Sequence, residues 1–181
     1  YTGDRGLAAR MWPRVAAAVS YLDALRQKRR TTEYESGEKK VFYGLLPESI
    51  SHEGYSAKPM HSYWDDFFGL RGLKDAVFLA TFLGKDEEAK AWARIRDEFS
   101  ADVHASLRLV IERKGIDWLP GCAELGDFDA TSSTAALAPG GELARRDEKV
   151  KERLTSYLYR PREELYDLER DPDELANLAD D

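Results

Sequence analysis

Apolar residues recur at helical spacing along the first part of the chain, and this pattern predicts a helix over residues 4–30. The apolar positions are separated by three or four residues, so they form one face of the helix. Asp4 suits the N-cap position, whereas Pro13 is expected either to kink the helix or to mark a later start. The face consists of Leu7, Met11, Val15, Ala18, Leu22 and Leu25.

Two further long helices and one short helix are predicted downstream. The second begins between Pro59 and Ser62, ends at Gly84, and is apolar at nearly every position, so we expect it to be buried almost all round. The third, over residues 86–114, has a single apolar stripe and stops at Gly115. The fourth is a short, alanine-rich helix over residues 132–138. Arg71, Lys74 and Asp75 make the narrow polar strip of the second helix.

The order of these helices favours an all-α fold with alternating outer and inner helices. One-sided helices would form the outer layer, and the two apolar ones the inner layer. Residues 31–40 and 116–131 are predicted to be loops. The composition changes sharply after residue 144, because residues 145–181 hold 20 charged side chains. We therefore predict a helical domain over residues 1–144 and a charged extension over residues 145–181.

Composition excludes several classes of partner. The chain of 181 residues carries 27 basic and 34 acidic side chains, a net charge of −7, which disfavours nucleic acid. No apolar run approaches the roughly 18–20 residues of a membrane span. The single cysteine, Cys122, cannot form an internal disulfide and makes a cysteine-based zinc site improbable. His52 and His61 lack a clear third ligand, so no metal and no cofactor are expected.

Three polar, aromatic-rich segments hold the candidate chemistry: residues 44–55, 61–66 and 121–129. The last two precede the two apolar helices. If those helices are parallel, their carboxylates converge on one edge of the fold, where aromatic rings would offer stacking faces for sugars. Cleavage of a glycosidic bond uses two such carboxyl groups, one of them held protonated by its surroundings.

Two phrases carry a resemblance to a known family, GLLPESISHEGYSAKPMHSYWDDFFGLRGLKDAVFLA and PGCAELGDFDATSST. Over about residues 1–144 the chain resembles the six-hairpin glycosidase superfamily, of the bacterial type linked to discoidin (coagulation factor 5/8 type) domains. The resemblance implies an (α/α)6 toroid of antiparallel helical hairpins and glycoside hydrolysis by acidic residues on the inner-helix loops. By position, the candidate catalytic residues are Glu48, Asp65, Asp66, Glu124 and Asp127. The candidate substrate-binding residues are His52, Tyr55, His61, Tyr63 and Trp64.

The chain departs from that family in two respects. A complete toroid has twelve helices and this chain offers four or five, so we expect a partial toroid that self-associates through its open side. The ending RPREELYDLERDPDELANLADD resembles the C-terminal tail of type I sulfatases, preceded by a helix over residues 145–159. The sulfatase nucleophile sequence is not present, because Cys122 lies in Cys-Ala-Glu-Leu-Gly.

The predicted function is therefore hydrolysis of glycosidic bonds in an oligosaccharide or polysaccharide. One alternative is a non-catalytic helical module that binds sugar, and a second is a sulfatase-related protein. A purely structural role is the alternative for several of these residues. Asp65 and Asp66 could be acidic simply because they lie at the N-terminal, positive end of a helix dipole, and Tyr63 and Trp64 could pack in the core. Export would suit such an enzyme, although no signal peptide is recognisable. The sequence leaves open which sugar is bound and which carboxyl group acts as the acid.

Overall fold

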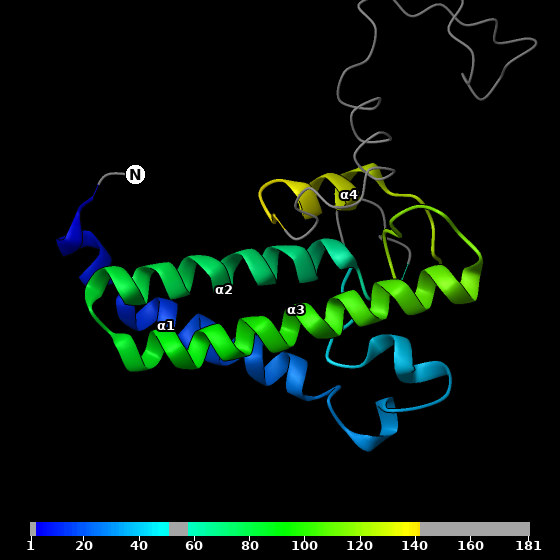
Figure 1. Ribbon diagram of the computed structural model, residues 1–181, viewed down its shortest axis with the longest axis horizontal. Helices are drawn as coiled ribbons and strands as arrows, with labels where there is room; N and C mark the ends of the chain where they lie inside the picture. The colour runs from blue at the N-terminus through cyan, green and yellow to red at the C-terminus, as the bar shows by residue number, and fades with distance from the viewer. Residues whose placement is uncertain (1–2, 51–57, 142–181) are drawn as a thin grey trace, which may run out of the picture. The chain divides into compact units, whose positions relative to one another are not determined.

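The computed structural model describes residues 3–50 and 58–141 (Figure 1). This part of the chain is helical and contains isolated β-bridges but no strand, which confirms the predicted all-α class. The chain divides into two compact units, residues 1–144 and 145–181, and the second lies outside the described residues together with its predicted helix and sulfatase-like tail. The helices are α1 (Arg5–Gln27), η1 (Thr32–Tyr34), η2 (Glu38–Phe42), α2 (Tyr63–Leu83), α3 (Asp86–Lys114) and α4 (Ala130–Leu137).

The helix ends follow from local chemistry. Asp4 caps α1 by accepting a hydrogen bond from the backbone N–H of Leu7 at 2.9 Å, and Pro13 lies inside this helix without ending it. Helices α2 and α3 end at glycines with positive φ, as predicted. Helix α4 begins two residues earlier than predicted, because Asp129 accepts hydrogen bonds from the N–H groups of Thr131 and Ser132. The predicted loop over residues 31–40 instead contains η1 and the start of η2.

Helix α2 packs against the other three α-helices (Figure 1). A short turn at Gly84 makes α3 antiparallel to α2. The side chain of Arg5, at the start of α1, donates hydrogen bonds to the carbonyls of Phe82 and Leu83 at the end of α2, so α1 is also antiparallel to α2. Residues buried between these helices include Val19, Phe67, Leu70, Leu73, Phe99, Val103 and Leu107.

Helices α2 and α4 run in parallel from the same end of the fold. Near its start, α2 is tied to the loop before α4, where the N–H of Tyr63 donates to the carbonyl of Gly121 at 3.0 Å. Further along α2, the Nζ of Lys74 donates to the carbonyl of Gly140 at 2.7 Å, and Gly140 lies just beyond the end of α4. The loops that precede the two apolar helices therefore share one end.

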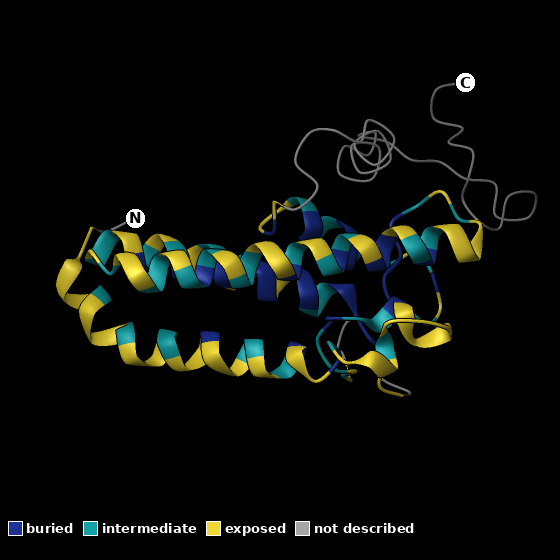
Figure 2. Cartoon of the chain, turned by 60° about the horizontal axis from the view of Figure 1, so that its bottom comes forward, coloured by how far each residue is buried: buried dark blue, intermediate teal, exposed yellow. Residues whose placement is uncertain are grey.

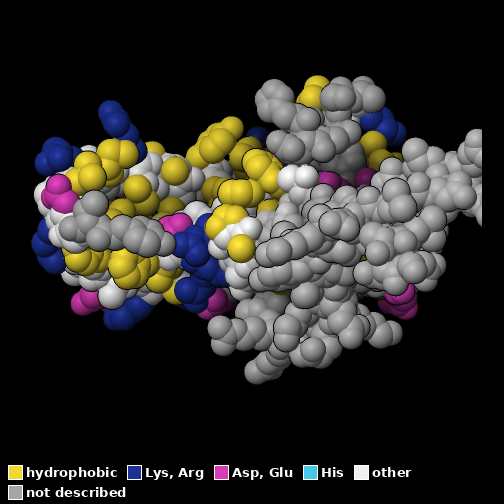
Figure 3. Space-filling view, turned by 90° about the horizontal axis from the view of Figure 1, so that it is seen from above, with side chains coloured by type: hydrophobic (Ala, Val, Ile, Leu, Met, Phe, Trp, Pro, Cys, Tyr) yellow, Lys and Arg dark blue, Asp and Glu magenta, His cyan; other side chains and the backbone are white. Residues whose placement is uncertain are grey.

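Burial of α2 on nearly all sides was a wrong prediction. Its side chains Phe68 and Phe78 are 40% and 69% exposed, and a groove of about 820 Å3 separates this flank of α2 from α1. Figure 2 shows exposed positions along the helices, and Figure 3 shows hydrophobic side chains gathered at this surface. The reason is that no helix in the described part of the chain covers this side of α2.

A membrane-spanning helix must combine sufficient length with a continuous apolar stretch, and none of the described helices does so.

Candidate functional site

Three loops meet at the end of the fold where α2 and α4 begin. Backbone pairs join Ser49 to Met60 and Ser62 to Cys122, and a third pair, Pro120 with Phe128, closes the loop before α4. We call this surface the rim and define it as residues 44–50, 58–62 and 119–129 together with the exposed side chains that begin α2. The convergence of these loops agrees with the expectation that the two apolar helices are parallel.

His61 lies at the centre of the rim and is held by Glu124. Its ring Nδ1 is 2.7 Å from Glu124 Oε1, and its backbone N–H donates to both carboxylate oxygens of Glu124, at 3.1 and 3.0 Å. The imidazole is buried and stacks on Phe42, with the ring centroids 4.2 Å apart. Glu124 and His61 thus form one rigid unit across two loops.

Arg29 and Glu48 complete the arrangement on the other side of His61. Arg29 Nε donates to His61 Nε2 at 2.9 Å, and the Arg29 guanidinium also forms an ion pair with Glu48. Glu48 Oε2 lies 3.5 Å from the same imidazole nitrogen. Sequence reasoning missed Arg29, because this residue follows α1 and lies outside the three candidate segments. The backbone N–H of Gly44 donates to the carbonyl of Arg29 at 3.4 Å, which joins Arg29 to the first of these segments.

The two carboxylates that flank His61 are held in their ionised form. A hydrogen bond from its own backbone N–H, together with the charge of Arg29, lowers the pKa of Glu48 despite partial desolvation. Burial raises the pKa of Glu124, but the hydrogen bonds that it accepts from the ring and the backbone of His61 outweigh this effect, so that its pKa is lowered. Both groups are therefore suited to accept hydrogen bonds as carboxylates, and each is a weaker base than an exposed glutamate.

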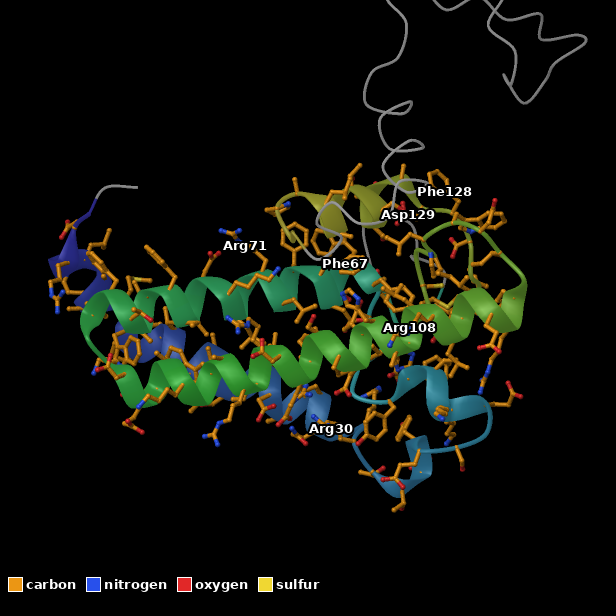
Figure 4. The ribbon with its side chains drawn as sticks, in the orientation of Figure 1. Arg30, Phe67, Arg71, Arg108, Phe128 and Asp129 are labelled. Carbon is orange, nitrogen blue, oxygen red and sulfur yellow. The ribbon has the colours of Figure 1, made fainter. Side chains whose placement is uncertain are left out.

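The rim also carries further acidic and aromatic side chains. Ser49 donates a hydrogen bond to Asp65, and Cys122 Sγ lies 3.5 Å from Asp127 Oδ1. Trp64 is partly exposed and packs on Phe68, with the ring centroids 4.4 Å apart. Phe128 is 51% exposed, and Figure 4 shows it next to Asp129, near the beginning of α2, with Arg71 further along that helix.

Two candidate residues lie in the interior, which corrects the roles predicted for them. Tyr63 is fully buried, and its hydroxyl is 2.7 Å from Ser106 Oγ, so its ring offers no stacking face to a sugar. Asp66 is 1% exposed and accepts a hydrogen bond from the N–H of Leu46 at 3.0 Å. At that depth Asp66 fixes the loop that leads to Glu48, and it does not reach a ligand.

The burial of Asp66 should make the stability of the fold depend on pH. Burial raises its pKa well above that of an exposed aspartate, so the native state keeps a proton that the unfolded chain releases above about pH 4. Stability is then lost as the pH rises, by up to about 1.4 kcal/mol per pH unit until native Asp66 ionises. We expect Asp66→Asn to flatten this fall in urea unfolding between pH 4 and 7. An equal slope in both proteins would contradict a protonated Asp66.

The candidates His52 and Tyr55 lie outside the described residues. Within residues 3–50 and 58–141, no three histidine, cysteine or acidic side chains are placed to bind a metal ion together. No protein-family model matches this chain, and no curated protein or solved structure shows significant similarity to it.

Proposed function

We propose that the rim is the carbohydrate-binding wall of a glycoside hydrolase-like site, acting on an oligosaccharide or polysaccharide. The observation that carries the proposal is the pair of ionised carboxylates, Glu48 and Glu124, that flank one buried imidazole on two loops of the rim, to which Asp65 is joined from the first turn of α2 by its hydrogen bond with Ser49. Carboxylates accept hydrogen bonds from sugar hydroxyls, and the partly exposed Trp64 and Phe128 offer apolar faces for sugar rings.

Position and charge assign roles within this proposal. Glu124, which is ionised and held by His61, is the candidate general base that would activate water. Asp65 is the candidate acid by position, because it is partly exposed on the rim whereas its neighbour Asp66 is buried beyond the reach of a substrate. Glu48 and Asp127 border the same surface and would contact neighbouring hydroxyl groups.

We also infer that the described helices are part of an (α/α)6 toroid. The parallel pair α2 and α4 would belong to the inner ring, and α1 and α3, which are both antiparallel to α2, to the outer ring. The groove between α1 and α2 is the side at which further helices would continue the ring, or at which a second copy would associate.

Trp64 provides a test of the proposed binding surface. We expect Trp64→Ala to weaken binding of a neutral oligosaccharide about tenfold, the equivalent of about 1.4 kcal/mol, through loss of one aromatic contact. Titration calorimetry with polysaccharide fragments of increasing length measures this change. Phe78→Ala is the matched control, because Phe78 is an exposed aromatic of the same helix but lines the groove. Equal effects of the two variants, or no binding by the unaltered chain, would contradict the proposal.

A second candidate function is non-catalytic sugar binding, and one observation favours it. Glu48 and Glu124 are both held ionised, whereas the carboxyl group that burial keeps protonated, Asp66, is inaccessible. A glycosidase needs an accessible protonated acid. Release of reducing ends, measured on the same oligosaccharides, separates the two functions: turnover that Asp65→Asn abolishes supports the hydrolase, and binding without turnover supports the module.

A further inference from the structure

The position of Arg29 determines what His61 can do at the rim. A guanidinium group has only hydrogen-bond donors and stays protonated in proteins. Because Arg29 Nε lies 2.9 Å from His61 Nε2, this imidazole nitrogen has to accept, and it therefore carries no proton. The proton of a neutral imidazole must then be on Nδ1, which faces Glu124 Oε1 at 2.7 Å.

We propose that Arg29 is a positioning residue: it fixes His61 as the neutral tautomer protonated at Nδ1, and this tautomer in turn orients the carboxylate of Glu124. The functional meaning of this role rests on the proposed carbohydrate site, whereas the tautomer itself does not. Without Arg29, both imidazole nitrogens would face carboxylates, Glu124 on one side and Glu48 on the other. Two neighbouring negative charges favour the doubly protonated ring.

Few groups besides Arg29 contact His61 and could affect which of its ring nitrogens carries the proton. The groups that face the imidazole are Arg29 after α1, Glu48 and Glu124 on the rim loops, and the uncharged ring of Phe42 from η2. Arg29 is itself 8% exposed and is tied to Glu48, which holds its guanidinium in place. The tautomer is thus determined by a donor whose position is fixed.

The test uses the nitrogen resonances of a single histidine. His52→Gln and His104→Gln together leave His61 as the one histidine of the chain, which has three. In long-range proton–nitrogen NMR spectra at neutral pH without sugar, we expect Nε2 to be unprotonated and Nδ1 to carry the proton. A proton on Nε2 in this protein would overturn the proposal, and that result does not depend on how any Arg29 variant folds.

Two variants of Arg29 separate positioning from packing. Lysine is also a donor-only side chain, whereas methionine is an unbranched side chain of similar bulk with no hydrogen-bond donor. We expect Arg29→Lys to retain the Nδ1 tautomer and Arg29→Met to lose it, with the two nitrogen resonances moving toward each other. Identical spectra for these two variants would overturn the donor-only account.

Oligosaccharide titrations of the same variants address function separately. We expect Arg29→Met to weaken binding about tenfold relative to Arg29→Lys, because the Glu124 carboxylate is no longer held in one orientation. Sugar affinities that do not differ between these variants would overturn the positioning role. If no variant and no parent protein binds sugar while the tautomer is as expected, the proposed function fails and the tautomer assignment stands.

Discussion

Replacing Asp102 with alanine is expected to lower the free energy of unfolding by about 3 kcal/mol, because it removes a partner of a buried arginine. The side chain of Arg26 is completely buried between α1 and α3, and its Nη2 donates to Asp102 Oδ2 at 2.8 Å. Its Nη1 donates to Asp23 at 2.9 Å, and its guanidinium lies over the ring of Phe99. Without Asp102, Nη2 loses its carboxylate in a site with little water, and the desolvation cost is no longer offset.

Urea unfolding of Asp102→Ala, Arg26→Met and the double variant measures this effect. Removal of Arg26 together with Asp102 should recover at least about 1 kcal/mol relative to the sum of the single changes, because the double variant buries no guanidinium that has lost its Asp102 partner. Asp75→Ala is the matched control, because it breaks an exposed ion pair with Arg71 on α2, for which we expect at most about 0.5 kcal/mol. A loss at Asp102 no larger than at Asp75 would show that the Arg26 site is well hydrated.

The helices could be predicted because their boundaries depend on local chemistry. The periodicity of α3, the cap at Asp4 and the glycines after α2 and α3 act within a few residues of the chain, so one sequence contains all the information required. The exposed flank of α2 could not be predicted in the same way. Apolar composition indicates that a surface needs a partner, but it does not show whether the described helices supply one.

The convergence of the candidate segments could be predicted from the sequence, but the surroundings of their side chains could not. The joint placement of Glu124 and Asp65 at one end of the fold followed from the parallel direction of α2 and α4. Asp66 is buried although Asp65 is its neighbour, because successive side chains of a helix point in different directions and the loop at Leu46 covers Asp66. The sequence alone does not indicate which of the two is covered. Arg29 entered the site through long-range packing of α1, for which the chain carries no local signal.

Gly44→Ala, which adds a single methyl group, is expected to destabilise the fold about as much as Asp102→Ala. Its φ is +70°, a conformation that costs an L-residue roughly 1–2 kcal/mol. A Cβ at this position would lie 2.9 Å from the Cβ of Asp102 and closer still to its carboxylate. We therefore expect Gly44→Ala to lower the free energy of unfolding by about 3 kcal/mol, combining backbone strain with overpacking of roughly 1–3 kcal/mol.

Gly115→Ala separates the two contributions to this loss. Gly115 has a left-handed conformation with a similar φ of +63°, but a Cβ there would meet nothing within 4 Å, so its loss should reflect backbone strain alone. In the Asp102→Ala background the obstructing carboxylate is gone and only the contact with the Cβ of residue 102 remains, so the cost of Gly44→Ala should fall toward that of Gly115→Ala. Equal costs of Gly44→Ala with and without Asp102 would contradict the clash. Because Gly44 begins the loop that carries Glu48, Gly44→Ala should also weaken any ligand binding at the rim.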